Sequence, residues 1–75
     1  MNTIGMFIEV EVMDAHIATC WRKAYIAAQH VDTVAERPAI DQCDVFMDNG
    51  HVWTVNASPA RMVHTIGRVM MAFSC

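Results

Sequence analysis

The sequence has few charged side chains, which make up 17% of its 75 residues, whereas about 25% is typical of soluble domains. Basic residues are the scarcer kind, with five Lys and Arg against eight Asp and Glu and a net charge of −3. Since a phosphate backbone repels an acidic chain on average, nucleic-acid binding is not expected. The combination of low hydrophobicity and high net charge that marks disordered chains is also missing.

Long apolar runs are absent too. A run such as Val69–Phe73 is far shorter than the roughly 18 to 20 residues that a membrane-spanning helix needs. Residues Met1–Gly5 carry no positive side chain and no signal-peptide pattern. We therefore expect no membrane association and a cytoplasmic location.

Close cysteine spacings are missing as well. Cys20, Cys43 and Cys75 form no C-x-x-C pair, so the chain is not a disulfide scaffold and fits a reducing compartment. The four histidines lack the paired spacing of zinc ligands. No nucleophile elbow, phosphate loop or dinucleotide fingerprint occurs. We predict no catalytic residues, metal or cofactor, and hence no enzyme.

Apolar residues are abundant, at 55% of the chain. A single domain this small, spanning residues 1–75, buries only about 60% of the surface that its unfolded chain exposes. Part of the apolar surface should therefore meet a partner. The first expectation is a homodimer or higher homo-oligomer, with another protein as a further partner.

Three segments carry clear local signals. Residues 7–12 alternate between apolar and polar side chains, which predicts a half-buried strand. Ser58 followed by Pro59 predicts the start of a helix that continues through Gly67 to Phe73. Its expected apolar stripe consists of Val63, Ile66, Met70 and Phe73, widened by Met62, Val69 and Met71.

Asn49-Gly50 is the preferred two-residue type I′ turn and predicts a β-hairpin over residues 43–56. That turn would pair Asp48 with His51 and Phe46 with Trp53. One face of the hairpin would then carry Phe46, Trp53 and Val55, and the other Val45, Met47 and Val52. Both faces are apolar, so one of them is expected to meet a second copy.

Residues 15–36 fit two structures. As a helix, they place Ile17, Trp21, Ala24, Ala28, Val31 and Ala35 on one face, and propensity favours this arrangement. As extended chain, they give a strand through Trp21 and Tyr25, a turn at Gln29–His30, and another strand near Asp32–Ala35.

The spacing over residues 24–66 resembles small FlbD/SwrD-type flagellar accessory proteins, and its layout is also similar to a shortened LytTR domain. The pattern consists of Ile26, Val31, Val34, Cys43, Val45, Met47, Asn49-Gly50, Val55, Ser58, Val63 and Ile66. The resemblance implies a β-meander that ends in a C-terminal helix, with residues 15–35 largely extended, and supplies no catalytic residues. The chain departs from the pattern in lacking a glycine turn within residues 14–23 and in residues 37–42, which look like an insertion. The DNA binding of LytTR domains is not carried over, because the chain has too few basic residues.

The resulting prediction is an α+β fold, a small antiparallel sheet containing the Asn49-Gly50 hairpin with the C-terminal helix packed on it. The alternative is a β-α-β-β-α order with a long helix at 15–36. The expected function is a non-enzymatic interaction module whose surface comprises Phe46, Trp53, Val55, Met62 and Met70. The alternative function is a small-ligand or nucleotide-binding protein with a pocket at a subunit interface, contacted by Trp21, Arg22, Lys23 and Tyr25.

Overall fold

The computed structural model describes residues 3–13, 20–38 and 41–73. These ranges contain an antiparallel six-stranded sheet and one long helix, which confirms the predicted α+β fold. The elements are β1 (Thr3–Ile4), β2 (Phe7–Met13), β3 (Trp21–Ala27), the short 3-10 helix η1 (Ala28–His30), β4 (Val31–Glu36), β5 (Cys43–Met47), β6 (Val52–Val55) and α1 (Pro59–Phe73). No helix in these ranges has both the length and the apolar character needed to cross a bilayer.

Strand β2 is the centre of the sheet and confirms the strand predicted from alternation. Its side chains at Ile8, Val10 and Val12 are buried, while Glu9 and Glu11 lie on the other face. Strand β3 pairs with β2 along its whole length, from Phe7 opposite Ala27 to Met13 opposite Trp21. The second edge of β2 is shared by β1 at one end and β6 at the other.

The long helix considered for residues 15–36 is wrong for the described part of that segment. Strand β3, η1 and β4 form an extended chain that turns sharply at Ala28–His30, as the extended alternative and the resemblance implied. Ile17 and the other residues of 14–19 lie outside the described ranges. Pairing with β2 overrides the helix propensity of the alanines, because Ile26 and Ala28 then reach the core beside Ile8.

The β5–β6 hairpin forms, but the predicted register is wrong by one residue. Phe46 pairs with Val52 and Val45 with Trp53, so the loop has three residues rather than two. Only Gly50 has a positive φ in this loop, at 88°. This is expected for a three-residue hairpin loop, in which a type I turn is followed by a residue in the left-handed conformation. A type I′ turn would need positive φ at Asn49 as well.

This one-residue shift changes which residues of β5 and β6 share a face of the hairpin, because neighbouring residues of a strand point to opposite sides. Cys43, Val45 and Val55 are buried on the inner face, with Trp53 half-buried beside them. Phe46 and Val52 lie opposite each other on the outer face and are exposed. Phe46 therefore does not share a face with Trp53 and Val55.

Helix α1 begins and continues as predicted. The Ser58 hydroxyl oxygen accepts a hydrogen bond from the backbone N–H of Arg61 at 3.2 Å, which caps the first turn. The helix passes through Gly67 without a break. Its buried side differs from the expected stripe: Met62 and Val69 are buried and Ile66 is packed against the core, whereas Val63 and Met70 are exposed. The side chain of Phe73 lies outside the described part.

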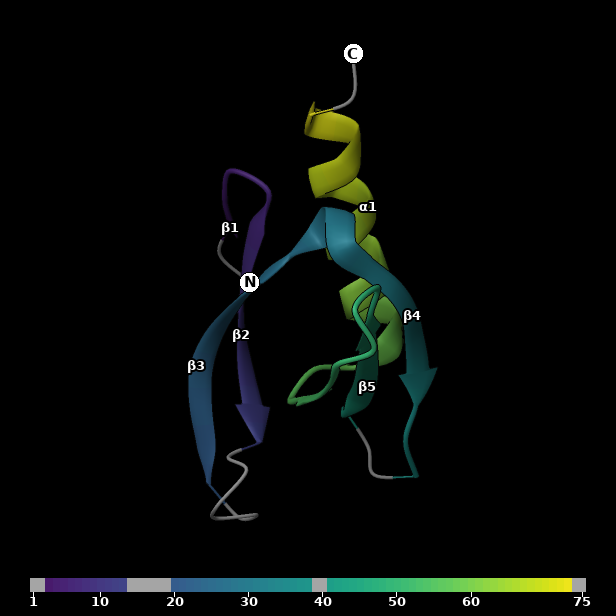
Figure 1. The fold of residues 1–75 in the computed structure, drawn as a ribbon. Helices are drawn as coiled ribbons and strands as arrows, with labels where there is room; N and C mark the ends of the chain where they lie inside the picture. The colour runs from purple at the N-terminus through teal and green to yellow at the C-terminus, as the bar shows by residue number, and fades with distance from the viewer. Residues whose placement is uncertain (1–2, 14–19, 39–40, 74–75) are drawn as a thin grey trace.

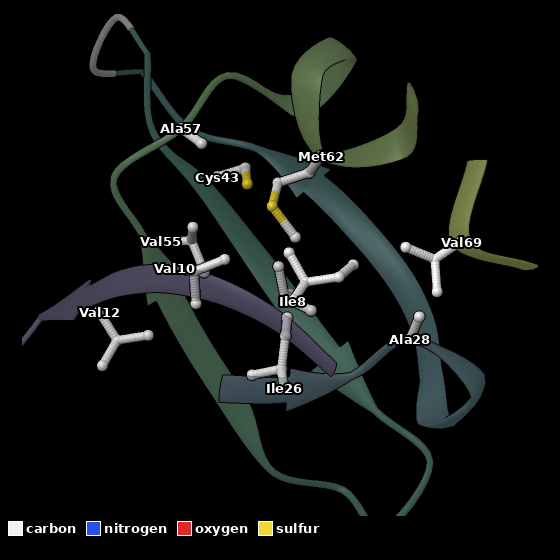
Figure 2. Packing of buried hydrophobic residues seen from close by; sticks show 11 residues of the cluster. Ile8, Val10, Val12, Ile26, Ala28, Cys43, Val55, Ala57, Met62 and Val69 are labelled. Atoms are coloured by element: carbon white, nitrogen blue, oxygen red, sulfur yellow. The ribbon is translucent and has the colours of Figure 1, made fainter. Parts of the chain in front are cut away.

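The core lies between the curled sheet and α1. Figure 1 shows β2 and β3 on one side, β4 and β5 on the other, and α1 running past the corner at η1. The two groups of strands meet where Val12 pairs with Val55, beside a hydrogen bond from the Asn56 N–H to the Glu11 carbonyl. Met62 of α1 extends toward Ile8 in the middle of this core (Figure 2), and both side chains are fully buried.

Candidate functional site

The predicted interaction surface is not assembled in one place. Val55 and Met62 are fully buried in the chain's own core, so the prediction that they lie on a surface is wrong. Trp53 is half-buried and contacts the His51 ring edge-on, at 4.2 Å between ring centroids. Phe46, on the outer face of β5, and Met70, on α1, remain exposed at 37% and 39%.

The four predicted ligand contacts all lie on β3 but point in two directions. Trp21, Lys23 and Tyr25 share the outer face, because alternate residues of a strand point the same way. Arg22 lies opposite Val12, on the other face. The fold therefore brings three of the four side chains together and separates the fourth.

An exposed apolar cluster lies beside these β3 residues. Ile4 pairs with Phe7 across the β1–β2 turn, and Tyr25 lies on the same outer face. The three side chains line a shallow hollow of about 290 Å³. They are 64%, 49% and 48% exposed, respectively. We call Ile4, Phe7 and Tyr25 the apolar patch.

Sequence reasoning missed two members of this patch. Ile4 lies in Met1–Gly5, a segment for which the sequence predicts no helix or strand. Phe7 precedes the buried residue Ile8, and it falls on the face that otherwise carries Glu9 and Glu11. A large apolar residue on the polar face of an alternating strand was the signal that could have found it.

The apolar patch continues into a charged stripe. The Lys23 ammonium lies 3.3 Å from the Glu9 carboxylate, and Lys23 also lies opposite Glu11 in the ladder. This pair is solvent-exposed on the lysine side, so it contributes little to stability. The outer face of β2 and β3 is therefore apolar at the end that carries the apolar patch and charged in the middle, around Lys23 and Glu9.

Strand β3 is an edge strand in the described part of the chain. It pairs with β2 on one side, and no described strand pairs with its other side. Figure 1 shows β3 at the outside of the sheet. A seven-residue edge with exposed backbone groups is a surface on which another strand can add.

Several other titratable groups make structural contacts. Asp48 pairs with His30 at 2.8 Å rather than with His51 as predicted, because the three-residue loop points its side chain toward η1. The Asp44 carboxylate accepts hydrogen bonds from Arg37 at 2.9 Å and from the Thr54 hydroxyl at 3.0 Å. The described ranges hold no group of three His, Cys, Asp or Glu side chains suited to a metal ion.

The described cysteines are a buried and an exposed thiol. Cys43 is fully buried, and burial raises the pKa of its thiol, with the neighbouring Asp44 carboxylate adding to the rise. A thiol without solvent access and with a raised pKa is a poor nucleophile. Cys20 is exposed and unpaired.

Comparison of the chain with protein families, with curated proteins and with solved structures finds no match. The resemblance to FlbD/SwrD-type proteins stays a prediction. The apolar patch and the adjoining edge of β3 are therefore the features from which a function is argued.

Proposed function

We propose that the protein is a small, non-enzymatic interaction module that forms a homodimer through the free edge of β3 and the apolar patch beside it. The observation that carries this proposal is the position of the patch next to a seven-residue edge strand. Apolar side chains give an interface affinity, and an edge strand gives it orientation through backbone hydrogen bonds.

The direction of the backbone groups along β3 supports such an addition. The Glu11 carbonyl accepts its hydrogen bond from Asn56, so the backbone groups of Glu11 point away from β3. In an antiparallel ladder, the opposite residue Lys23 must then point its own backbone groups away from β2. Because alternate residues of a strand point their backbone groups to the same edge, the backbone groups of Trp21, Tyr25 and Ala27 also point away from β2.

One antiparallel register between two β3 strands uses all of these groups. With Ala24 opposite Ala24 of the second copy, Trp21 faces Ala27, and Lys23 faces Tyr25. Each outward-pointing residue then faces another outward-pointing residue, so every free N–H and C=O of the edge gains a partner. The register is fixed by a two-fold axis at Ala24.

The side chains agree with this register. Lys23 faces an aromatic ring and Arg22 faces Ile26, so no charge meets its own copy. Centring the pair on Lys23 would set two ammonium groups against each other. On the outer face, Trp21 of the second copy would lie beside Ala27, which is itself next to Phe7 of the apolar patch.

The thiols fit the cytoplasmic setting that we propose for this dimer. Cys20 and Cys43 are both free, as expected for cysteines in a reducing compartment.

The test is the oligomeric state of three proteins by sedimentation equilibrium at micromolar concentration. Lys23→Pro removes an N–H that points to the free edge, a position where an edge strand tolerates proline. Lys23→Ala is the matched control, since it loses the same contact with Glu9 but keeps the N–H. We expect the wild type and Lys23→Ala to be dimers and Lys23→Pro to be a monomer with an unchanged circular dichroism spectrum.

A monomeric wild type would overturn the proposal, and so would a dimeric Lys23→Pro protein. If Lys23→Pro fails to fold, Tyr25→Arg provides the same readout without changing the backbone. In the proposed register it faces Lys23 of the second copy, so it should also give a monomer.

A further inference from the structure

A second groove lies between the β1–β2 turn and helix α1, away from the edge of β3. Its volume is about 390 Å³. The helix contributes Arg61, His64, Arg68 and Val69 to its wall, while β1 contributes Thr3 and the turn contributes Gly5. Spacings of three and four residues place the helical residues on one side of α1, next to the side that carries Met62 into the core.

The charged side chains that line this groove are basic, although Arg61 also lines a neighbouring hollow together with Glu9 and Glu11. No Asp or Glu side chain is among its lining residues, although the chain as a whole has a net charge of −3. Two other basic residues, Lys23 and Arg37, pair with Glu9 and Asp44. The guanidinium groups of Arg61 and Arg68 make no ion pair among the described residues.

The hydrogen-bonding groups of the groove are mainly donors. A guanidinium presents a planar fork of N–H groups that matches two oxygens of an oxyanion. The Thr65 hydroxyl already donates to the Arg61 carbonyl at 2.8 Å, so the available donors come from Arg61, His64, Arg68 and the hydroxyl of Thr3. Val69 and Ala72 add an apolar part to the lining.

We propose that this groove binds a phosphate-bearing small molecule, with the phosphate between Arg61 and Arg68 and the uncharged part of the molecule against Val69 and Ala72. Two cations match the charge of a phosphate monoester, and the volume leaves room for more than the phosphate alone. The site does not rest on the proposed dimer, because no β3 residue lines it.

A small molecule fits this groove better than a nucleic acid does. Of the basic residues on β3, Arg22 and Lys23 point to opposite faces and line no part of it. A polynucleotide needs a longer track of positive charge than two arginines provide.

The test follows amide chemical shifts of the ¹⁵N-labelled protein at low salt during titration with inorganic phosphate, adenosine monophosphate or adenosine. Both phosphate-containing probes should give saturable shifts over residues 61–72, and adenosine should give none. The double variant Arg61→Ala/Arg68→Ala should weaken binding of adenosine monophosphate by at least about tenfold, since it removes the charged hydrogen-bond donors. Arg22→Ala removes one positive charge outside the groove and should leave the affinity within about twofold of the wild-type value.

Four results would overturn the site: no saturable shift with either phosphate probe, equal binding of adenosine, an equal loss in Arg22→Ala, or much tighter binding of a short oligonucleotide than of the mononucleotide. Lys23→Pro should bind adenosine monophosphate as the wild type does. Failure of this site and failure of the dimer are therefore separate results.

Discussion

His30 and Asp48 join two distant parts of the chain through a side-chain and a backbone contact. The His30 Nδ1 lies 2.8 Å from the Asp48 Oδ2, and the Asp48 N–H donates to the His30 carbonyl, also at 2.8 Å. The pair ties the loop of the β5–β6 hairpin to the corner between β3 and β4. The turn at η1 is therefore fixed to the hairpin loop by one backbone hydrogen bond and one side-chain contact.

A double-mutant cycle with His30→Ala and Asp48→Ala should give a favourable coupling of up to about 1 kcal/mol, as expected of a solvent-exposed pair. The same cycle between Asp48 and His51 should give a coupling near zero, because the loop does not bring these side chains together. Urea denaturation of the single and double variants measures both values. A larger coupling for Asp48 and His51 than for His30 and Asp48 would indicate the two-residue turn.

Substitution of two glycines by alanine should change stability in opposite directions. Gly50 has a φ of 88°, so Gly50→Ala should destabilise the protein by about 1 to 2 kcal/mol. Gly67 lies in the middle of α1, and a Cβ there would meet no atom within 4 Å. Gly67→Ala should therefore stabilise it by about 0.5 to 1 kcal/mol.

Chemical denaturation of both variants tests these signs. A stabilising Gly50→Ala would contradict the hairpin loop described above. A destabilising Gly67→Ala would contradict a continuous α1 with an open surface at this position.

Two methionines of the same helix should differ strongly in their contribution to stability. Met62 is fully buried among Ile8, Cys43 and their neighbours, so Met62→Ala should cost about 2 to 5 kcal/mol. Met71 is 79% exposed, and Met71→Ala should change stability by less than about 0.5 kcal/mol. Equal effects on the denaturation midpoint would mean that α1 packs through another face.

The two described cysteines should react at very different rates with iodoacetamide. In a Cys75→Ser protein, Cys20 should be alkylated in the folded state, because its side chain is exposed. Cys43 is buried with a raised pKa and should react only after denaturation. Mass spectrometry of the labelled peptides identifies the site, and rapid labelling of Cys43 under native conditions would contradict its burial.

The raised pKa of Cys43 also predicts a loss of stability at alkaline pH. The unfolded thiol ionises near its ordinary value of 9.0, while the folded thiol stays protonated to higher pH. The free energy of unfolding should therefore fall as the pH rises from about 9 through the folded-state pKa. Urea midpoints at about pH 8 and about pH 10 should differ less in Cys43→Ala than in the wild type.

Local signals in the sequence predicted the elements whose cause is local. The alternation around Ile8 and Val10 identified β2, and Ser58 with Pro59 identified the start of α1. Residues 20–36 were ambiguous because their helix propensity competes with pairing to β2, and that pairing depends on residues distant in the sequence. The choice between helix and strand in this segment is made only when the sheet assembles.

The hairpin register could have been predicted from burial rather than from the turn. Cys43, Val45 and Met47 alternate with Asp44, and Trp53 and Val55 alternate with Thr54. Placing both apolar sets on one face requires Val45 opposite Trp53, which is the observed register. The Asn-Gly pair favoured a different loop length, and the free energy of burying the inner face outweighed that preference.

The single pair between Val12 and Val55 has a consequence during protein synthesis. Strands β2 and β3 leave the ribosome before β6 and α1 do. The apolar side of β2 therefore stays uncovered until β6 and Met62 have emerged. Until then the nascent polypeptide exposes Ile8, Val10 and Val12 to water or to a chaperone. Coverage of the apolar side of β2 therefore depends on β6 and Met62, which follow it in the chain.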